Sequence, residues 1–331
     1  MRHRVLIVGA GSIGERHLRC FQATGRADIV LVEKHPERCR RVAERHGVRR
    51  AFTDVADSLA EPIDAAVIAT PAPFHVSQAT ELARRGIHLL IEKPLSTSML
   101  GIAALQEAVQ TRGLTAAVAY VYRCHPLLAA MRQALLDGRF GKPLELIVVA
   151  GQHFPTYRPA YRDIYYIDRA MGGGAIQDAL THLVNAGEWL VGPVDRLVVD
   201  AAHQSLEGVT VEDTVHLLAR HGAVMGSYSL NQYQAPNETT LTVICERGAA
   251  RFELHESRWR WLTEISGTWN NEGGETMERD TMFIAQAHAF LDAVESNRPV
   301  PCTLQEGVQT LRVNLAALTS MDQGNWQTIT R

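Results

Sequence analysis

The chain has 331 residues, more than a single hydrophobic core usually serves, so its length predicts two domains. Hydrophobic residues make up 46% and charged residues 21%, a composition typical of globular proteins. The formal net charge is -3, and lysine and arginine form no long block. This argues against nucleic acid as the main partner, because neutralising phosphates requires clustered positive charge.

No apolar stretch approaches the roughly 18 residues of a membrane helix, so we expect no membrane anchoring. The apolar run Val5–Val8 is short and breaks into glycines, which predicts a first strand rather than a signal peptide. The five cysteines are dispersed without a CxxC pair. That pattern favours a reducing cytoplasm over a disulfide framework or a zinc site, and we expect no metal.

The first part of the chain, to about residue 120, alternates short apolar runs with amphipathic segments. Apolar residues occupy both faces of the expected strands, as in a parallel sheet that helices cover on both sides. This part therefore predicts an α/β domain with a doubly wound parallel sheet. The expected strands are Val5–Val8, Ile29–Glu33, Ala65–Ala69, His88–Glu92 and Thr115–Tyr120. The expected helices are Ile13–Thr24, Pro36–His46, His75–Arg85 and Ser98–Arg112.

After Pro126 the pattern changes to longer β-type runs, several of which alternate apolar with polar residues. Such alternation is typical of a mostly antiparallel sheet with one less-buried face, which indicates an α+β domain. The expected strands are Leu144–His153, Arg196–Gln204, Val211–Arg220, Ala223–Gln232, Leu241–Glu246 and Ala249–His255. Two helices, Phe283–Ser296 and Gln305–Met321, follow a polar loop at residues 265–280. We expect one domain at residues 1–123 and the other at 124–331.

The first strand runs into Gly9-Ala10-Gly11-Ser12-Ile13-Gly14, which has the GxGxxG spacing of a dinucleotide-binding turn. The first glycine permits a tight turn, the second lets backbone N–H groups approach a pyrophosphate, and the third lets the helix pack on the strand. The start of that helix also favours negative charge. The residues expected to bind the cofactor at this turn are Gly9, Gly11, Ser12, Ile13 and Gly14.

An acidic residue, Glu33, ends the second expected strand, about 20 residues after Gly14. A carboxylate at this position accepts both ribose hydroxyls of NAD and repels the 2′-phosphate of NADP. The expected cofactor is therefore NAD. Lys34, His35 and Arg38 follow directly and keep NADP open, and we count Arg38 among the expected cofactor-binding residues.

Two further strands end in polar residues: Thr70-Pro71, with His75 close behind, and Glu92-Lys93-Pro94. The carboxyl ends of parallel strands lie at one edge of the sheet, where open α/β folds bind ligands. We therefore expect Thr70, Pro71, His75, Glu92 and Lys93 beside the glycine turn, in contact with the cofactor. Taken alone, Glu92-Lys93-Pro94 also fits a charged strand exit with a proline stop.

Residues 175–191 predict an amphipathic helix. At about 100° per residue, Asp178 and His182 lie one turn apart, opposite its apolar stripe. Asn185 and Trp189 continue their line. Lys, Glu and Arg are the usual residues of a solvated helix face, so we interpret this line as lining a cleft. A surface i,i+4 pair is the alternative.

Three glycines, Gly172–Gly174, precede this helix. Without Cβ atoms they let the helix start approach a cofactor, a substrate or another surface closely, and leave N–H groups to bind it. A hinge that needs positive φ is the alternative explanation.

Together, Glu92-Lys93-Pro94, Thr70-Pro71 with His75 and the GxGxxG start resemble the glucose–fructose oxidoreductase / inositol dehydrogenase / MocA family. Gly172–His182 resembles that family's glycine-rich helix start with Asp and His four apart, and the resemblance covers essentially the whole chain. It implies a Rossmann domain followed by an α+β domain with a large open sheet. It also implies oxidation or reduction of sugars, cyclitols or related compounds with NAD or NADP, and a homodimer or homotetramer formed through that sheet.

By the same resemblance, the catalytic residues are Lys93, Asp178 and His182. Arg123, in Arg123-Cys124-His125-Pro126, resembles the arginine of the family's Arg-Phe-x-Pro, with Cys124 in place of the aromatic residue. We therefore expect Arg123 at the cofactor.

Hydride transfer from a carbinol to nicotinamide needs a base for the hydroxyl proton. His182 suits this role because imidazole titrates near neutral pH, and Asp178 would orient it. Lys93 would stabilise the charge that develops on the same oxygen. Alternatively Lys93 carries the proton, and the residues alone leave both assignments open.

The segment at residues 157–166 is dense in tyrosine and arginine, which stack on sugar rings and hold anionic groups. Its arginines raise the hypothesis of a phosphorylated, carboxylated or nucleotide-linked sugar. A tyrosine-rich dimer surface is the alternative. The residues expected to bind substrate are Tyr122, Arg158, Arg162, Tyr165, Asp178 and His182.

The expected function is that of a cytoplasmic NAD(H)-dependent oxidoreductase acting on a sugar, cyclitol or sugar derivative. Two other classes stay open. An epimerase, lyase or glycosidase that works through transient oxidation by tightly held NAD would use the same residues. A non-catalytic nucleotide-sensing or scaffold protein is the third class, and the intact set of Lys93, Asp178 and His182 argues against it.

Overall fold

The computed structural model describes residues 2–330 and divides into two compact units. The first contains the chain up to Cys124 together with Glu278–Val308. The second contains His125–Met277 together with the chain from Gln309 onward. The division after Cys124 lies one residue from the expected boundary. The sequence patterns do not predict the return of residues 278–308 to the first unit.

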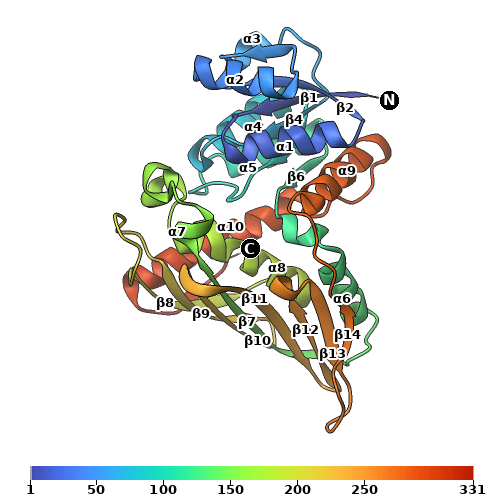
Figure 1. Cartoon of the computed structure of the whole chain (residues 1–331), viewed down its shortest axis with the longest axis vertical. Coiled ribbons are helices and arrows are strands. Elements are labelled where there is room, and N and C mark those ends of the chain that lie inside the picture. The colour runs from blue at the N-terminus through green and yellow to red at the C-terminus, as the bar shows by residue number, and fades with distance from the viewer. Residues whose placement is uncertain (1, 331) are drawn as a thin grey trace. The chain divides into compact units, whose positions relative to one another are not determined.

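A six-stranded parallel sheet forms the first unit, in the order β3-β2-β1-β4-β5-β6. Its strands β1, β2, β4 and β6 are labelled in Figure 1. The strand order reverses between β1 and β4, the position where open α/β sheets bind ligands. The strands are β1 (His3–Val8), β2 (Ala27–Val32), β3 (Arg50–Phe52), β4 (Ala65–Ile68), β5 (His88–Ile91) and β6 (Ala116–Val118). The helices are α1 (Ser12–Ala23), α2 (Pro36–His46), α3 (Val55–Ser58), α4 (His75–Arg84), α5 (Ile102–Thr111) and α9 (Thr281–Ser296). The predicted parallel α/β sheet is confirmed.

Packing and ion pairs explain why α9 belongs to the first unit. Val5 of β1 lies in one buried apolar cluster with Phe21 of α1 and Phe290 of α9. The two phenylalanine rings meet edge to face at 6.2 Å. At the start of α9, Arg19 donates to both carboxylate oxygens of Asp280. The helix thus completes the core over one face of the sheet.

The second unit is built on a nine-stranded sheet in the order β14-β13-β12-β11-β7-β10-β9-β8-β15. All neighbouring strands are antiparallel except β7 and β10, which confirms the expected mostly antiparallel sheet. The strands are β7 (Pro143–His153), β8 (Arg196–Ala202), β9 (Thr214–His221), β10 (Val224–Asn231), β11 (Tyr233–Cys245), β12 (Gly248–Glu253), β13 (Arg258–Leu262), β14 (Asn270–Gly273) and β15 (Gln327–Thr328). The helices are α6 (Pro126–Leu136), α7 (Phe154–Tyr157), α8 (Thr181–Val191) and α10 (Leu304–Gln323), whose first turn counts with the first unit.

Four short strands, β3, β13, β14 and β15, lie outside the strands expected from sequence. β14 lies within residues 265–280, which we expected to be a polar loop, and that expectation is wrong there. Its residues are all exposed and polar, so only the pairing with β13 identifies them as a strand. β3 was not expected either, because three partly exposed residues are too few to show a period. No helix within residues 2–330 is both long and apolar enough to cross a membrane.

Candidate active site

The glycine turn after β1 has the geometry that a dinucleotide requires. Gly9 has φ +96°, and a Cβ there would lie 2.7 Å from the carbonyl oxygen of Ala69. A Cβ on Gly14 would overlap the Gly9 carbonyl, whereas Gly11 faces open space. α1 begins with Ser12 and Ile13, and no side chain caps its N-terminus. The N–H groups of this first turn therefore fit a pyrophosphate.

Glu33 directly follows β2, and its carboxylate is turned back onto this loop. It is buried and accepts the N–H of Ala10 at 2.8 Å and that of His35 at 3.0 Å. Arg38 lies 3.6 Å away, half exposed and paired with the same carboxylate. A carboxylate offers about four lone pairs, so Glu33 retains acceptors for ribose hydroxyls.

The ends of β1, β4 and β5 lie at one edge of the parallel sheet. Val8 pairs with Ile68, and Ile68 with Ile91, so the three strands end in register. The glycine turn, Thr70-Pro71 and Lys93 therefore follow at the same edge, as the sequence predicts.

For His75 the structure favours a supporting role over cofactor contact. The ring is buried, with Nε2 2.6 Å from the carbonyl oxygen of Thr70 and Nδ1 3.1 Å from that of Pro94. Burial lowers the pKa of His75, although Thr70, Glu92 and Pro94 act in the opposite direction. The ring thus contacts both the loop after β4 and the loop after β5, and as a neutral imidazole it donates its one N–H to one of the two carbonyl oxygens.

Glu92 is likewise buried and engaged with protein groups. Its Oε1 lies 2.7 Å from Nε2 of His17 on α1, and its Oε2 accepts the N–H of Lys93 at 2.9 Å. Burial raises the pKa of Glu92, but the bond from His17 and the charges of His17 and Lys93 outweigh it and leave the pKa lowered. Glu92 therefore supports the backbone of Lys93, and its contact with the cofactor stays a prediction.

The two candidate residues after β6, Tyr122 and Arg123, both contact other residues of the first unit. Arg123 is buried and donates to the carbonyl oxygen of Pro301 and to the carboxylate of Glu306. These bonds indicate that Arg123 anchors the first turn of α10, where Glu306 lies. Tyr122 packs beside Phe283 in a small apolar cluster, and burial raises its pKa to about 12, so its hydroxyl stays protonated.

In the second unit, Gly172–Gly174 serve close packing within the protein. Gly172 has φ +91° and Gly174 φ +85°, as the hinge interpretation predicts. A Cβ on Gly173 would overlap the carbonyl oxygens of Tyr165 and Tyr166, and one on Gly174 the carboxylate of Glu212. Neighbouring protein atoms therefore require glycine at Gly173 and Gly174, and positive φ favours it at Gly172.

The N–H groups at this helix start are occupied, which corrects the expectation that they await a ligand. Gly173 donates to Asp168 O and Gly174 to Tyr166 O. Ala175 and Ile176 donate to the backbone and side-chain oxygens of Glu212, whose carboxylate also accepts from Arg169 at 3.0 Å. Burial raises the pKa of Glu212 despite these bonds.

The helix itself departs from the uniform α spacing that the sequence suggests. Ile176–Leu180 form a π turn, and α8 follows from Thr181. Asp178 lies on the π turn and is buried, while His182 is half buried in the first turn of α8. Asn185 is buried and donates to Thr310 of α10, so the predicted polar line does not face one cleft along its whole length.

Asp178 lies among hydrogen-bond donors from the preceding segment. The hydroxyl of Tyr165 donates to its Oδ1 at 2.7 Å, and Nη1 of Arg158 lies 3.8 Å from its Oδ2. Burial and the charge of Asp178 raise the pKa of Tyr165, which keeps this hydroxyl a donor. Arg162 instead bonds Glu207, so only one of the two expected arginines accompanies Asp178.

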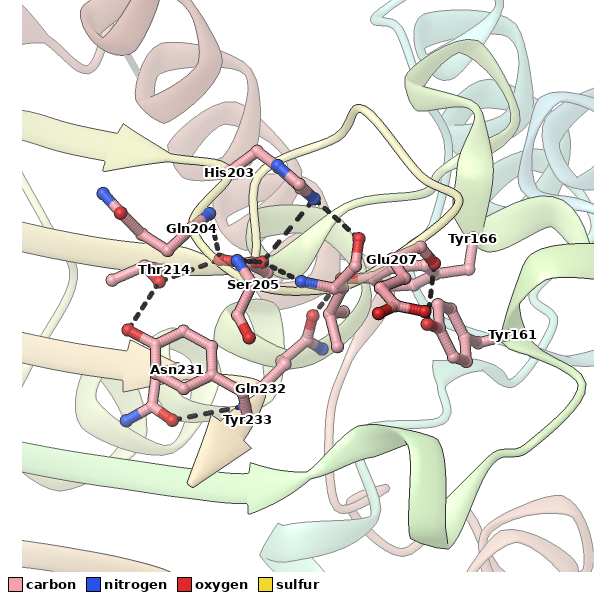
Figure 2. A network of polar contacts seen from close by, with 12 residues as sticks. Tyr161, Tyr166, His203, Gln204, Ser205, Glu207, Thr214, Asn231, Gln232 and Tyr233 are labelled. Carbon is pink, nitrogen blue, oxygen red and sulfur yellow. Dashed lines mark hydrogen bonds and ion pairs between the residues drawn. The ribbon is translucent and has the colours of Figure 1, made fainter. Parts of the chain in front are cut away.

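A polar network holds the segment that carries Tyr165 (Figure 2). Tyr161 donates to the carbonyl oxygen of Glu207 at 2.7 Å, and Tyr166 donates to the side chain of Gln232. Asp213 accepts three backbone N–H groups of the facing loop, at residues 204–206, and the hydroxyl of Thr214. The loop with Glu207 is therefore fixed against the tyrosines.

The sequence patterns do not predict two supporting residues, His17 and Glu212. His17 lies on the buried face of α1 with Gly14, Leu18 and Phe21, and a histidine on an apolar helix face was the available signal. Glu212 had no such signal, because its partners lie about 40 residues earlier in the chain. Within residues 2–330 no group of three or more His, Cys, Asp or Glu side chains is placed to hold a metal ion.

The glycine turn at the sheet's switch point, with Glu33 turned onto it, places the first unit among the dinucleotide-binding oxidoreductase domains. The chain belongs to the GFO/IDH/MocA oxidoreductase family. Residues 3–120 match the family's NAD-binding Rossmann fold, and residues 128–251 match its C-terminal domain.

Three relatives illustrate the likeness. UDP-N-acetylglucosamine 3-dehydrogenase of Acidithiobacillus ferrooxidans is 28% identical over 331 residues, covering 95% of each chain. 4-Carboxy-2-hydroxymuconate-6-semialdehyde dehydrogenase of a Sphingobium species is 30% identical, over 76% of this chain and 79% of its own. Levoglucosan dehydrogenase in complex with NADH has a similar fold, with a TM-score of 0.92 and 20% identity over the whole of both chains.

Proposed function

We propose that the protein is an NAD-dependent dehydrogenase or reductase acting on a hydroxyl or carbonyl carbon of a sugar, cyclitol or sugar derivative. The observation that carries this proposal is the common sheet edge. There the glycine turn, Glu33 and Lys93 follow in-register parallel strands. The named relatives, which act on sugars and on a carboxylated semialdehyde, support the substrate class.

NAD fits the residues of the first unit. The N–H groups of Ser12 and Ile13 would hold the pyrophosphate, and Glu33 the adenosine ribose, where its charge disfavours a 2′-phosphate. When bound, NAD supplies the nicotinamide carbon that exchanges hydride with the substrate.

The proposed catalytic residues are Lys93, Asp178 and His182. The Lys93 ammonium stabilises the charge that develops on the reacting oxygen, and the imidazole of His182 exchanges its proton. Asp178 is held by Tyr165 and orients His182. The alternative in which Lys93 carries the proton uses the same residues.

Arg158 and Tyr165 are the substrate-binding residues that the second unit supports best, because both lie at Asp178. Arg158 would favour a substrate that bears a carboxylate or phosphate. Tyr122 stays a candidate, whereas the bonds of Arg162 to Glu207 favour a structural role for that arginine.

Ligand screening tests this proposal. Thermal shifts are measured with NAD, NADH, NADP and NADPH, and NADH formation is then followed with myo-inositol, D-xylose, levoglucosan, D-glucuronate and UDP-N-acetylglucosamine. We expect a shift with NAD and NADH only, of the size that mass action gives, and NADH formation with at least one compound. Absence of any nucleotide shift on cofactor-free folded protein would exclude the proposal. Product formation without net NADH would indicate a redox-neutral reaction instead.

We also propose a cytoplasmic homodimer or homotetramer that forms through the sheet of the second unit. Val149, Leu218 and Met225 lie on one face of adjacent strands, and Leu218 and Met225 are 54% and 52% exposed. All five cysteines are free thiols, which suits a reducing compartment. Light scattering should show an oligomer that Leu218→Asp dissociates, while the exposed-loop change Ile265→Asp leaves it intact. A monomeric wild type would refute the assembly.

A further inference from the structure

Lys93 lies between two residues that each contact a buried histidine. Before it, Glu92 bonds Nε2 of His17 with one oxygen and the N–H of Lys93 with the other, at 2.7 and 2.9 Å. After it, the carbonyl oxygen of Pro94 lies 3.1 Å from Nδ1 of His75. The backbone is therefore held on both sides of the lysine.

The two histidines come from different helices of the first unit. His17 lies on α1, the helix that begins at the glycine turn, and its ring meets Phe283 of α9 edge to face at 5.6 Å. His75 opens α4, and its second nitrogen lies 2.6 Å from the carbonyl oxygen of Thr70. Through these contacts the lysine's backbone is joined to the glycine-turn helix and to the loop after β4.

Neither histidine is available to a ligand as a reacting group. Each ring is 1% exposed, and the carboxylate of Glu92 that joins His17 to Lys93 is buried as well. A buried carboxylate is retained only with donors that compensate its lost hydration, and Glu92 has two of them. The arrangement is thus built into the core beneath the sheet edge.

We propose that His17, Glu92 and His75 are positioning residues for Lys93. Lysine carries its amine on a flexible four-carbon stem, so the place of the ammonium depends on the backbone from which that stem starts. A displacement of about 1 Å at a reacting group can cost on the order of a hundredfold in rate. The proposal rests on the catalytic role proposed for Lys93.

The test compares His17→Leu, which removes the donor, with His17→Gln, whose amide N–H reaches a similar distance. Glu92→Gln keeps the shape of the side chain without its charge. For each variant, NADH affinity is measured by fluorescence titration. Values of kcat and KM are measured with the compound of the panel that gives the fastest NADH formation. We expect His17→Leu and Glu92→Gln to lower kcat on the order of ten- to a hundredfold with little change in NADH affinity, and His17→Gln to restore most of it.

His221→Leu is the matched control. His221 is a buried histidine of the second unit, bonded to the carbonyl oxygen of Gly192 and to Tyr228. We expect this variant to lower the melting temperature with kcat unchanged. If His17→Leu and Glu92→Gln show that same behaviour, their role is structural only and the proposal fails. If Glu92→Gln weakens NADH binding while kcat holds, Glu92 is a cofactor ligand and the proposal fails as well.

Two further measurements separate this proposal from the proposed function. Wild-type turnover by Lys93→Met would refute the role of the lysine itself. Deuterium exchange of the peptide spanning residues 89–97 needs no substrate. Exchange should rise in His17→Leu and remain at the wild-type level in His221→Leu. Unchanged protection in His17→Leu would overturn the inference.

Discussion

At the scale of single residues, the buried carboxylate of Asp178 is held in place by two polar side chains. Tyr165 donates to one of its oxygens, and Arg158 lies beside the other. Because burial and this charge raise the pKa of Tyr165, its hydroxyl remains protonated and donates to Asp178. The pair thus fixes the direction in which Asp178 presents its remaining lone pairs.

Removing this hydroxyl should impair turnover more than stability. Tyr165→Phe leaves the ring in place and deletes one charge-assisted bond, which is worth about 1.5–3 kcal/mol, or roughly ten- to a hundredfold. We expect kcat/KM to fall in that range with NADH affinity unchanged. The exposed Tyr157 of the same segment provides the control, since Tyr157→Phe should behave as wild type. Equal activity of Tyr165→Phe and wild type would show that Asp178 does not depend on this bond.

Lys93 allows the sharpest residue-level test of catalysis. Lys93→Met keeps an unbranched side chain but removes the ammonium, so charge on the reacting oxygen loses its stabilisation. We expect kcat to fall about 10²–10⁴-fold, whichever of the two proton-transfer assignments holds. Stopped-flow measurement of NADH formation gives the value, and NADH titration shows whether cofactor binding persists, as we expect.

At the scale of elements, the start of the helix with Asp178 depends on one glycine. Gly174 has φ +85°, and the carboxylate of Glu212 occupies the place of its missing Cβ. Gly192, at the other end of α8, has φ +103° but open space around it. Both positions have a positive φ that strains any substituted side chain, and only Gly174 adds a steric overlap.

Alanine substitutions at Gly174 and Gly192 should separate backbone strain from steric overlap. Gly192→Ala should cost about 1–2 kcal/mol in the free energy of unfolding, from strain alone. Gly174→Ala should cost more, because the carboxylate must move, and should also lower activity through Asp178. Urea unfolding of both variants measures the difference, and equal costs would contradict the role of Glu212.

The loop that faces the tyrosine segment should respond to acid through Asp213. Burial raises the pKa of Asp213, but its bonds to three backbone N–H groups and to Thr214 outweigh this and lower it. The stabilisation is therefore present above the ordinary aspartate pKa of about 3.9 and is lost as pH falls through the lower native value. Melting temperatures of wild type and Asp213→Asn should differ at pH 7 and converge at low pH. A constant difference would contradict this assignment.

The elements differ in how far they could be predicted from sequence. The glycine turn, Glu33 and Lys93 depend on strand ends, which local apolar runs predict well. Tyr165 and Asp178 are 13 positions apart across irregular turns, and Glu92 and His17 are 75 apart, so no local period predicts either contact. The π turn at Ile176–Leu180 was missed because a periodic pattern assumes uniform α geometry.

At the scale of the whole molecule, the chain does not divide into two consecutive domains. Residues 278–308 complete the first unit, where Phe290 covers Phe21 and Asp280 accepts from Arg19. Sequence patterns identify α9 as a helix but carry no information about the sheet on which it packs. In residues 1–124 alone, the apolar face of α1 therefore lacks the helix that covers it.

A fragment of residues 1–124 should consequently fold poorly. We expect it to bind the dye ANS and to unfold without a sharp transition, because Phe21 and its neighbours lack their cover. Joining residues 278–308 to the fragment through a Gly/Ser linker should restore a cooperative transition and binding of NADH. Cooperative unfolding of the short fragment would show that α9 is dispensable.

This discontinuity also has a consequence for biosynthesis. After Cys124 leaves the ribosome, about 180 more residues must be made before Val308 follows, which takes roughly 10–40 s at 5–20 residues per second. During that interval the nascent sheet exposes the side of α1 that α9 later covers, while the intervening unit is still being synthesised. Synthesis of the cofactor-binding unit starts first but ends only at Val308. Its folding therefore depends on the synthesis of nearly the whole polypeptide.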